Sequence, residues 1–370
     1  MPDLFAPLQL GDVSLPNRVI MAPLTRCRAV SPAGDDTRVP NALMAEYYTQ
    51  RASAGLILSE ATSVDAMGVG YPNTPGIWSE EQVAGWRRIT EAVHSAGGRM
   101  FLQLWHVGRV SDPVYLRGAL PVAPSAIAPA GHVSLVRPMR PYMTPRALEL
   151  SEIPGVIAAY RRGAENAQRA GFDGVEIHGA NGYLLDQFLQ DSSNHRTDEY
   201  GGSIENRARL MLEVTDACIG VWGASRVGVH LAPRCDSHGM GDSDPLATFT
   251  HVSRELGRRG IAFLCARESI TGKRIGPAMK RAFTGARSDG GGVYIANEAF
   301  TRESAEQVLG AGEADAVAFG RLFIANPDLP RRLREGAPLN PARPGLFYAS
   351  GAEGYTDYPA LEGASAPSPA

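Results

Sequence analysis

One short segment, residues 178–183 (HGANGY), contains three side chains of types that act together in enzymes. The imidazole N–H of His178 and the amide N–H of Asn181 could bind one oxygen atom and stabilise negative charge that develops on it. The phenol of Tyr183 could supply a proton beside them. A metal site is a poorer interpretation, because one His and one Asn without a nearby carboxylate make an incomplete ligand set. The segment therefore predicts a clamp for a carbonyl group, with His178, Asn181 and Tyr183 as the catalytic residues.

Such side chains need a rigid scaffold, and the chain alternates short apolar runs with longer stretches of helical periodicity. We predict strands at residues 19–24, 56–62, 100–106, 174–178, 227–231, 261–266, 293–297 and 316–320. We predict helices at residues 41–54, 79–96, 151–170, 204–221, 245–259, 277–283, 301–309 and from about 327. Eight strands, each followed by a helix, predict an α/β fold of the (β/α)8 TIM-barrel type. An open doubly wound sheet is the rival architecture, but no predicted strand leads into a G-x-G-x-x-G turn.

In a TIM barrel the active site lies at the carboxyl ends of the strands and in the loops that follow them. Polar residues occupy many of these predicted positions, and each of them alone could merely satisfy loop backbone groups. They are Thr25, Arg26, 60–62, 103–106, 178–183, His230, Arg267, Asn297 and Arg321. Their convergence on one end of the barrel predicts a single site that combines most of them.

Two segments do not fit a simple strand-and-helix repeat. Residues 108–150 are rich in Pro, Ala and Gly, and we expect an excursion after the third strand that forms a hairpin lid. The stretch 269–292 blurs the position of the sixth helix, and its sequence indicates no function. We expect residues 1–362 to form one barrel domain and residues 363–370, composed of Gly, Ala, Ser and Pro, to be a disordered tail.

Composition narrows the classes of partner. A formal net charge of -3 in 370 residues offers no basic surface for nucleic acid or for an anionic membrane. No stretch approaches the roughly 18 uninterrupted apolar residues that a membrane span requires. The four cysteines lie far apart, which predicts neither a disulfide framework nor a zinc site. The N-terminus carries no targeting pattern, so the cytoplasm is the expected compartment.

A series of motifs in a fixed order resembles the old yellow enzyme family of FMN-dependent ene-reductases over nearly the whole chain. The matching motifs are MAPLTR at 21–26, SEAT at 59–62, QLWHVGR at 103–109, APSA at 123–126, HGANGYLLDQF at 178–188, YGGSIENR at 200–207 and FGRLFIANPD at 319–328. Any one of them could occur by chance, whereas the ordered series would not. The family fold is a single TIM barrel with FMN across its carboxyl-terminal mouth, in agreement with the strand count above.

The resemblance implies roles for individual residues. It implies that FMN is bound by Pro23, Leu24, Thr25, Ala61, Gln103, His230, Asn297, Gly320 and Arg321. Within this set, Gln103 would bind the pyrimidine edge of the flavin, and Gly320 and Arg321 would hold the phosphate. NADPH or NADH would give a hydride to the flavin, which would pass it to an electron-poor alkene. His178 and Asn181 would bind the carbonyl or nitro oxygen that activates the alkene, and Tyr183 would protonate its α-carbon. The family implies a monomer or a homodimer.

Two positions depart from the family pattern. His230 stands where the family usually has Arg or Lys facing the flavin; a protonated His230 could replace that cation in part, whereas a neutral one would not. Glu298 stands beside the expected phosphate, where relatives have small residues; we expect its side chain to turn to solvent rather than toward the phosphate. His230 keeps open the alternative of a redox-neutral isomerase or cyclase that makes little or no use of flavin. A third interpretation is a ligand-binding or scaffold protein built on an inactive barrel.

Overall fold

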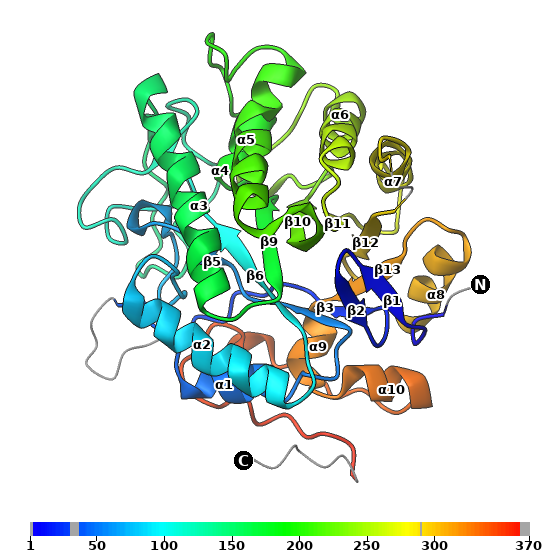
Figure 1. Ribbon diagram of the computed structural model, residues 1–370. Helices are drawn as coiled ribbons and strands as arrows, with labels where there is room; N and C mark the ends of the chain where they lie inside the picture. Colours follow the sequence, from blue (N-terminus) through cyan, green and yellow to red (C-terminus); the bar gives the residue numbers. More distant parts are fainter. Residues whose placement is uncertain (1–2, 30–36, 289–290, 363–370) are drawn as a thin grey trace.

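A closed ring of parallel strands forms the centre of the molecule (Figure 1). The computed structural model describes residues 3–29, 37–288 and 291–362. The strands of the ring are β3 (Val19–Met21), β4 (Leu56–Leu58), β6 (Met100–Trp105), β9 (Gly174–Gly179), β10 (Val227–Leu231), β11 (Phe263–Arg267), β12 (Val293–Asn297) and β13 (Ala316–Phe319). Each strand pairs in parallel with the next, and β13 pairs with β3 in the register Val317↔Val19, which closes the ring.

Helices surround the ring and connect its strands (Figure 1). They are α1 (Ala42–Thr49), α2 (Glu80–Ser95), α3 (Ile153–Arg169), α4 (Leu184–Leu189), α5 (Ile204–Trp222), α6 (Pro245–Arg258), α7 (Gly276–Gly285), α8 (Arg302–Gly310), α9 (Arg321–Ala325) and α10 (Leu329–Glu335). Short 3₁₀ helices span Ala66–Gly68, Leu150–Glu152, Ala224–Arg226, Ser237–Gly239 and Pro344–Leu346. The arrangement confirms the predicted α/β (β/α)8 barrel. No helix in the described ranges is long and apolar enough to cross a lipid bilayer.

Helix α2 begins where the sequence supplies a cap. The hydroxyl of Ser79 accepts the backbone N–H of Gln82, and the side chain of Gln82 accepts the backbone N–H of Ser79, so two otherwise unpaired donors at the start of α2 are satisfied. Val83, Trp86 and Val93 of α2 are buried, and their spacing of three to seven residues places them on one face of the helix. This pattern packs the helix against the strands.

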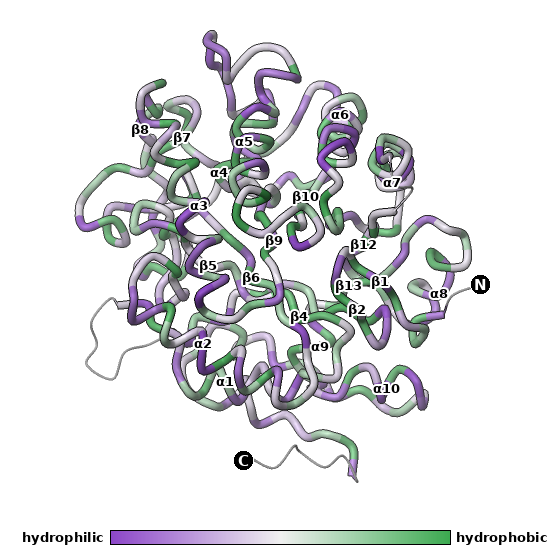
Figure 2. The backbone as a smooth tube through the Cα atoms, viewed as in Figure 1, coloured by the Kyte–Doolittle hydropathy of each residue, from purple (hydrophilic) through white to green (hydrophobic). Residues whose placement is uncertain are grey.

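Apolar side chains fill two layers, one inside the ring and one between the ring and the helices. The strands of the ring are mostly hydrophobic, whereas the helices carry both kinds of residue (Figure 2). An antiparallel pair, β1 (Leu8–Leu10) and β2 (Val13–Leu15), packs Leu10 and Leu15 into the inner layer. The hairpin turn requires glycine, because Gly11 has φ +53° and a Cβ there would lie 1.9 Å from the carbonyl oxygen of Ser225.

The predicted second strand, residues 56–62, is interrupted. It divides into β4 and the two-residue β5 (Thr62–Ser63), which pairs with β6. Between them the Tyr48 hydroxyl accepts the backbone N–H of Glu60, and the Thr62 hydroxyl donates to the Glu60 carbonyl. These side-chain hydrogen bonds replace the strand ladder at this point, which turns the chain at the barrel mouth.

The excursion after β6 is present, and its short strands β7 (Val122–Ala123) and β8 (Arg146–Ala147) pair in parallel. Within the described ranges, the contact in this excursion that resembles a hairpin is a single antiparallel bridge, His132↔Pro141. The lid function remains a prediction. The stretch 269–292 contains α7, while its residues 289–290 lie outside the described ranges, as does the expected tail 363–370.

The segment after α10 runs back to the loop that follows β3. Arg26 donates hydrogen bonds to the carbonyls of Phe347 and Gly354, and Arg28 donates to those of Leu346 and Phe347. The side chains of both arginines are fully buried. Buried guanidinium groups need such acceptors, so the C-terminal segment fixes the loop that carries Thr25.

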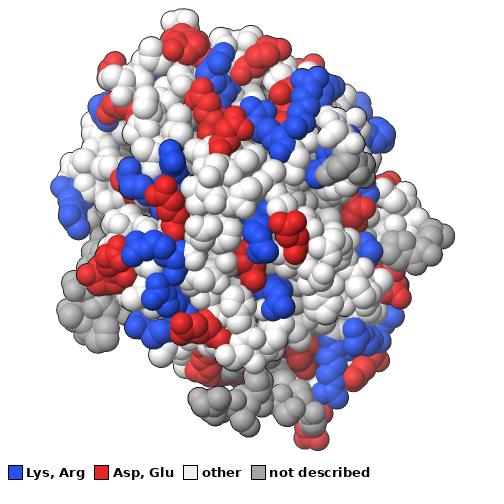
Figure 3. Space-filling model, viewed as in Figure 1, with Lys and Arg blue, Asp and Glu red and all other residues white. Residues whose placement is uncertain are grey.

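Basic and acidic side chains are interspersed on the face seen in Figure 3, and neither sign dominates a large area of it.

Candidate active site

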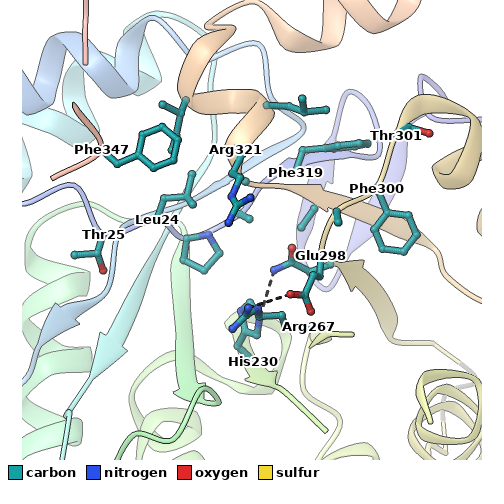
Figure 4. A pocket seen from close by; sticks show the side chains of 18 of the residues that line it. Leu24, Thr25, His230, Arg267, Glu298, Phe300, Thr301, Phe319, Arg321 and Phe347 are labelled. Carbon is teal, nitrogen blue, oxygen red and sulfur yellow. Dashed lines mark hydrogen bonds and ion pairs between the residues drawn. The ribbon is translucent and has the colours of Figure 1, made fainter. Parts of the chain in front are cut away.

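A cavity of about 980 Å³ opens at the carboxyl ends of the ring strands. Figure 4 shows part of its lining, contributed by loops that are far apart in the sequence. The lining includes every residue predicted to be catalytic or to bind the cofactor: Pro23, Leu24, Thr25, Ala61, Gln103, His178, Asn181, Tyr183, His230, Asn297, Gly320 and Arg321. Its volume is at the upper end of the range of roughly 300–1,000 Å³ that is typical of small-molecule and cofactor sites. The predicted residues are therefore brought together in one space, while the role of each remains a prediction.

His178 lies at the end of β9 with its side chain almost fully buried. Burial lowers the pKa of the imidazole well below its ordinary range, and the nearby His230 and Arg267 lower it further. The ring is therefore neutral at physiological pH. Its Nδ1 accepts the backbone N–H of Ala180 at 3.3 Å, which assigns the single ring proton to Nε2. The predicted role requires an imidazole N–H donor, which Nε2 can supply.

Asn181 and Gly182 form a tight turn between β9 and α4. Both residues have positive φ, +59° and +78°, a conformation that Asn and Gly adopt more readily than other residues. The buried carboxyl of Asp186 accepts the Gly182 N–H at 2.8 Å and a hydrogen bond from Gln190 Nε2 at 2.7 Å. Burial raises the pKa of Asp186 to about 7. Asp186, in the first turn of α4, therefore fixes the loop that contains Asn181 and Tyr183.

Tyr183 lies beside His178, with ring centroids 5.0 Å apart and an interplanar angle of 88°. Its hydroxyl is 2.8 Å from the hydroxyl of Tyr71, and either could be the donor. Burial raises the pKa of Tyr183 well above its ordinary value, so the phenol keeps its proton at neutral pH. Trp105 packs edge-on against Tyr183 at 5.0 Å, and within the described residues its buried indole N–H has no hydrogen-bond partner. A protonated phenol and a neutral imidazole thus line the same part of the cavity.

His230 lies on β10 between a carboxylate and an amide. Its Nδ1 is 3.2 Å from Glu176 Oε1, and neither atom forms a hydrogen bond within the described residues. Its Nε2 is 3.4 Å from Asn297 Nδ2 and 3.8 Å from Cys265 Sγ. The ligand atoms of Glu176, His230 and Cys265 lie within 4.8 Å of one another. Glu176 and Cys265 approach opposite ring nitrogens, however, so this group is poorly arranged to bind one metal ion through a single nitrogen.

The donors and acceptors of the cavity fit a flavin nucleotide. Gln103 donates Nε2 to Glu176 at 2.7 Å, which leaves its Oε1 available to accept from the edge of a ring. At the other end, Gly320 precedes α9 and the guanidinium of Arg321 points into the cavity (Figure 4). Guanidinium and backbone N–H groups suit a phosphate. His230 lines the same cavity, and its buried Nδ1 has no hydrogen-bond partner within the described residues.

The expectation that Glu298 turns to solvent is wrong. Its carboxylate lines the cavity, where Oε1 lies 3.0 Å from Arg267 Nη2. Figure 4 shows the two side chains pointing toward one another beside His230. The physical reason is the cation: Arg267 gives the carboxylate a partner inside the cavity, which solvent exposure would not. Glu298 also adopts φ +103°, a strained value for a residue with a side chain.

Some contacts of the site were not predicted from the sequence. The sequence placed Arg267 at a strand end but indicated no role for it. Trp105 lies in a matching motif, where its type alone indicates only packing. Tyr71 follows β5 in a loop without any chemical signal, so its contact with Tyr183 depends on the folded structure.

Comparison with known proteins decides the family. Residues 3–340 match the NADH:flavin oxidoreductase / NADH oxidase family. The chain belongs to this family. It is similar to a probable flavin mononucleotide-dependent alkene reductase of Leishmania infantum, with 44% identity over 96% of this chain and 97% of that protein. It is also similar to 12-oxophytodienoate reductase 1 of Oryza sativa subsp. japonica, with 43% identity over 97% of this chain and 93% of that protein.

Solved structures agree with this assignment to the NADH:flavin oxidoreductase family. Morphinone reductase in complex with tetrahydroNAD is 50% identical, with a TM-score of 0.91 over 98% of this chain and 99% of that chain. The old yellow enzyme homologue from Zymomonas mobilis is 45% identical, also with a TM-score of 0.91, over 97% of this chain and 99% of that chain. The protein is an FMN-dependent oxidoreductase of the old yellow enzyme type, which confirms the predicted family, fold class and enzyme class.

Proposed function

We propose that this protein reduces the activated C=C bond of α,β-unsaturated carbonyl or nitro compounds, with NADPH or NADH as the source of hydride. The observation that carries the proposal is the convergence of a neutral His178, the amide of Asn181 and the protonated phenol of Tyr183 in one cavity. These are the groups needed to bind an activating oxygen and to protonate carbon. The alkene reductase among the similar proteins supports the same chemistry.

The chain's own residues divide the work. His178 Nε2–H and the Asn181 amide donate hydrogen bonds to the carbonyl or nitro oxygen, which stabilises the negative charge that develops there. Tyr183 donates its proton to the α-carbon, and its raised pKa keeps that proton available across the neutral range. Trp105 and Tyr71 pack around Tyr183 and restrict its position. Fixed donors of this kind stabilise the transition state more than the ground state.

Bound FMN would supply the hydride-transfer chemistry that links the nicotinamide to the alkene. We propose that Pro23, Leu24, Thr25 and Ala61 hold its ring, that Gln103, His230 and Asn297 bind its polar atoms, and that Gly320 and Arg321 hold its phosphate. The redox-neutral alternative rested on His230. It loses support, because the chain belongs to the NADH:flavin oxidoreductase family and the other residues expected to hold a flavin line one cavity.

The test separates the two half-reactions. FMN-loaded protein is reduced anaerobically with NADPH or NADH and then mixed with 2-cyclohexenone in a stopped-flow spectrometer. We expect Tyr183→Phe to slow reoxidation by the alkene roughly 10²- to 10⁴-fold, the usual contribution of a general acid, and to leave reduction by the nicotinamide nearly unchanged.

A matched control is Tyr160→Phe, because Tyr160 is fully buried and lies outside the cavity lining. This variant is expected to behave as the parent protein in both half-reactions. Equal slowing of both half-reactions by Tyr183→Phe would remove Tyr183 as the proton donor. Protein that does not retain FMN, even after reconstitution, would remove the proposed function itself.

A further inference from the structure

Arg267 reaches from the end of β11 to the turn after β9 and contacts a residue proposed to bind the substrate. Its Nη1 donates to Asn181 Oδ1 at 2.7 Å, and its Nη2 donates to Glu298 Oε1 at 3.0 Å. We propose that Arg267, held by Glu298, is a positioning residue that fixes the Asn181 amide so that its N–H group, rather than its oxygen, faces the substrate. The inference rests on the proposed function, since it assigns a purpose to a contact of the proposed clamp.

The chemistry of the two groups determines the orientation. A guanidinium has only hydrogen-bond donors, whereas a carboxamide has an acceptor on one side and donors on the other. The side of Asn181 that faces Arg267 must therefore be the oxygen, and Nδ2 is directed elsewhere. Within the described residues no protein group accepts from Nδ2, so its hydrogens are available to a ligand in the cavity. An amide turned the other way would present its oxygen to the substrate oxygen and repel it.

Arg267 also affects the second donor of the clamp. Its charge is one of the causes that lower the pKa of His178, after burial and the neighbouring His230. A neutral His178 with Nδ1 occupied by the Ala180 N–H offers one donor, Nε2–H. One guanidinium thus orients the Asn181 amide and favours the neutral form of His178, and both side chains would bind the same oxygen.

The backbone conformation of Glu298 indicates that its contact with Arg267 contributes to the active site rather than to folding stability. Glu298 has φ +103° and the next residue, Ala299, has φ +58°. Such conformations are unfavourable for residues with a side chain and persist where surrounding contacts impose them. The Arg267–Glu298 pair is about one third exposed on each side chain, and ion pairs of that kind contribute little to folding. The strained loop therefore brings a carboxylate to Arg267 without a matching gain in stability.

The rival explanation is that Arg267 binds an anionic group of the substrate directly. Its Nη1 also lies 3.9 Å from Cys235 Sγ, and its side chain is 36% exposed. Because Glu298 already neutralises the guanidinium on one side, the geometry favours positioning. Measuring the affinity of an uncharged ligand discriminates between the two explanations.

The experiment measures the dissociation constant of cyclohexanone, a saturated ketone that cannot be reduced, from the perturbation of the flavin absorbance of FMN-loaded protein. We expect Arg267→Met to weaken binding roughly tenfold, the effect of losing a charge-assisted hydrogen bond that orients a donor. Arg234→Met is the matched control, because Arg234 follows β10, bonds the carbonyls of Ser269 and Thr271, and lies outside the cavity lining. It is expected to leave the affinity unchanged.

A double-mutant cycle tests whether Arg267 acts through Asn181. We expect Asn181→Ala to weaken ketone binding, and we expect Arg267→Met to add nothing in the Asn181→Ala background. Full additivity would overturn the proposal, because Arg267 would then contact the ligand itself. If Asn181→Ala does not weaken ketone binding, both the proposed clamp and the positioning role of Arg267 are refuted. If the two substitutions are additive, only the positioning role is refuted, and the proposed function stands.

Glu298→Gly provides a readout that a merely structural role would not produce. Glycine relieves the positive φ while the carboxylate is lost, so we expect unchanged or greater resistance to urea together with weaker ketone binding. Retained affinity would exclude Glu298 from the positioning group. If Arg267→Met does not fold, Arg267→Lys carries the test: it keeps the charge with fewer fixed donors, and an affinity equal to that of the parent would overturn the proposal.

Discussion

Replacing Asp186 by Asn should change how stability depends on pH. The carboxyl is fully buried, and its pKa is raised from 3.8 to about 7 by burial. Between these values the native state holds a proton that the unfolded state has lost, so the free energy of unfolding falls as pH rises from about 4 to 7. A pKa shift of this size lowers the free energy of unfolding by about 4 kcal/mol in total, or by about 1.4 kcal/mol for each pH unit. Because asparagine cannot titrate, the variant should lack this contribution to the pH dependence of the free energy of unfolding.

Urea unfolding at pH 5, 6, 7 and 8 measures the effect, with the dependence on urea checked for a constant slope. The difference in unfolding free energy between Asp186→Asn and the parent is expected to shift in favour of the variant by about 1.4 kcal/mol per pH unit up to pH 7 and then to level off. A difference that stays constant from pH 5 to 8 would show that Asp186 does not carry the proton. The matched control is Asp191→Asn, since Asp191 lies on the same connection but is half-buried.

Two further predictions concern the cavity. Tyr71→Phe removes the 2.8 Å contact between the two hydroxyls, so we expect it to slow the alkene half-reaction roughly tenfold through lost stabilisation of the Tyr183 phenolate. Stopped-flow measurement of both half-reactions checks this, and an unchanged alkene step would contradict it. His230→Arg places a permanent cation beside Glu176 and is expected to raise the flavin midpoint potential by roughly 30 mV for each 1.4 kcal/mol gained by the reduced flavin. Spectroelectrochemical titration measures it, and an unchanged potential would mean that position 230 does not face the reduced ring.

The position of the site could be predicted because a parallel barrel brings every strand end to one mouth. Periodicity located the strands well enough that β10 and β12 have the predicted bounds. Once strand ends are known, His178, His230 and Asn297 must lie near one another, whatever the details of the loops. The family motifs then identified the cofactor that such a mouth would bind.

Contacts between loops could not be predicted, because they depend on side-chain reach and on loop conformation. Nothing in the sequence indicates that Glu298 turns inward, since this requires both a positive φ and the partner Arg267 from a different strand. The interruption of the second strand depends on Tyr48, a residue of α1, which bonds the backbone of Glu60. The β1–β2 hairpin was also missed, although residues 8–15 alternate around a Gly-Asp turn.

The contacts of Arg26 have a consequence for synthesis on the ribosome. Arg26 and its acceptor Phe347 are 321 positions apart. The second strand that pairs with β3 is β13, which is synthesised much later. At about 5–20 residues per second, translation takes roughly 16 to 64 s to supply those partners. Throughout that interval the first strand of the ring has an open edge and its guanidinium groups stay hydrated. The emerging polypeptide therefore cannot close its barrel before β13 has been made, and a chain that stops near residue 345 lacks the Phe347 carbonyl that accepts from Arg26.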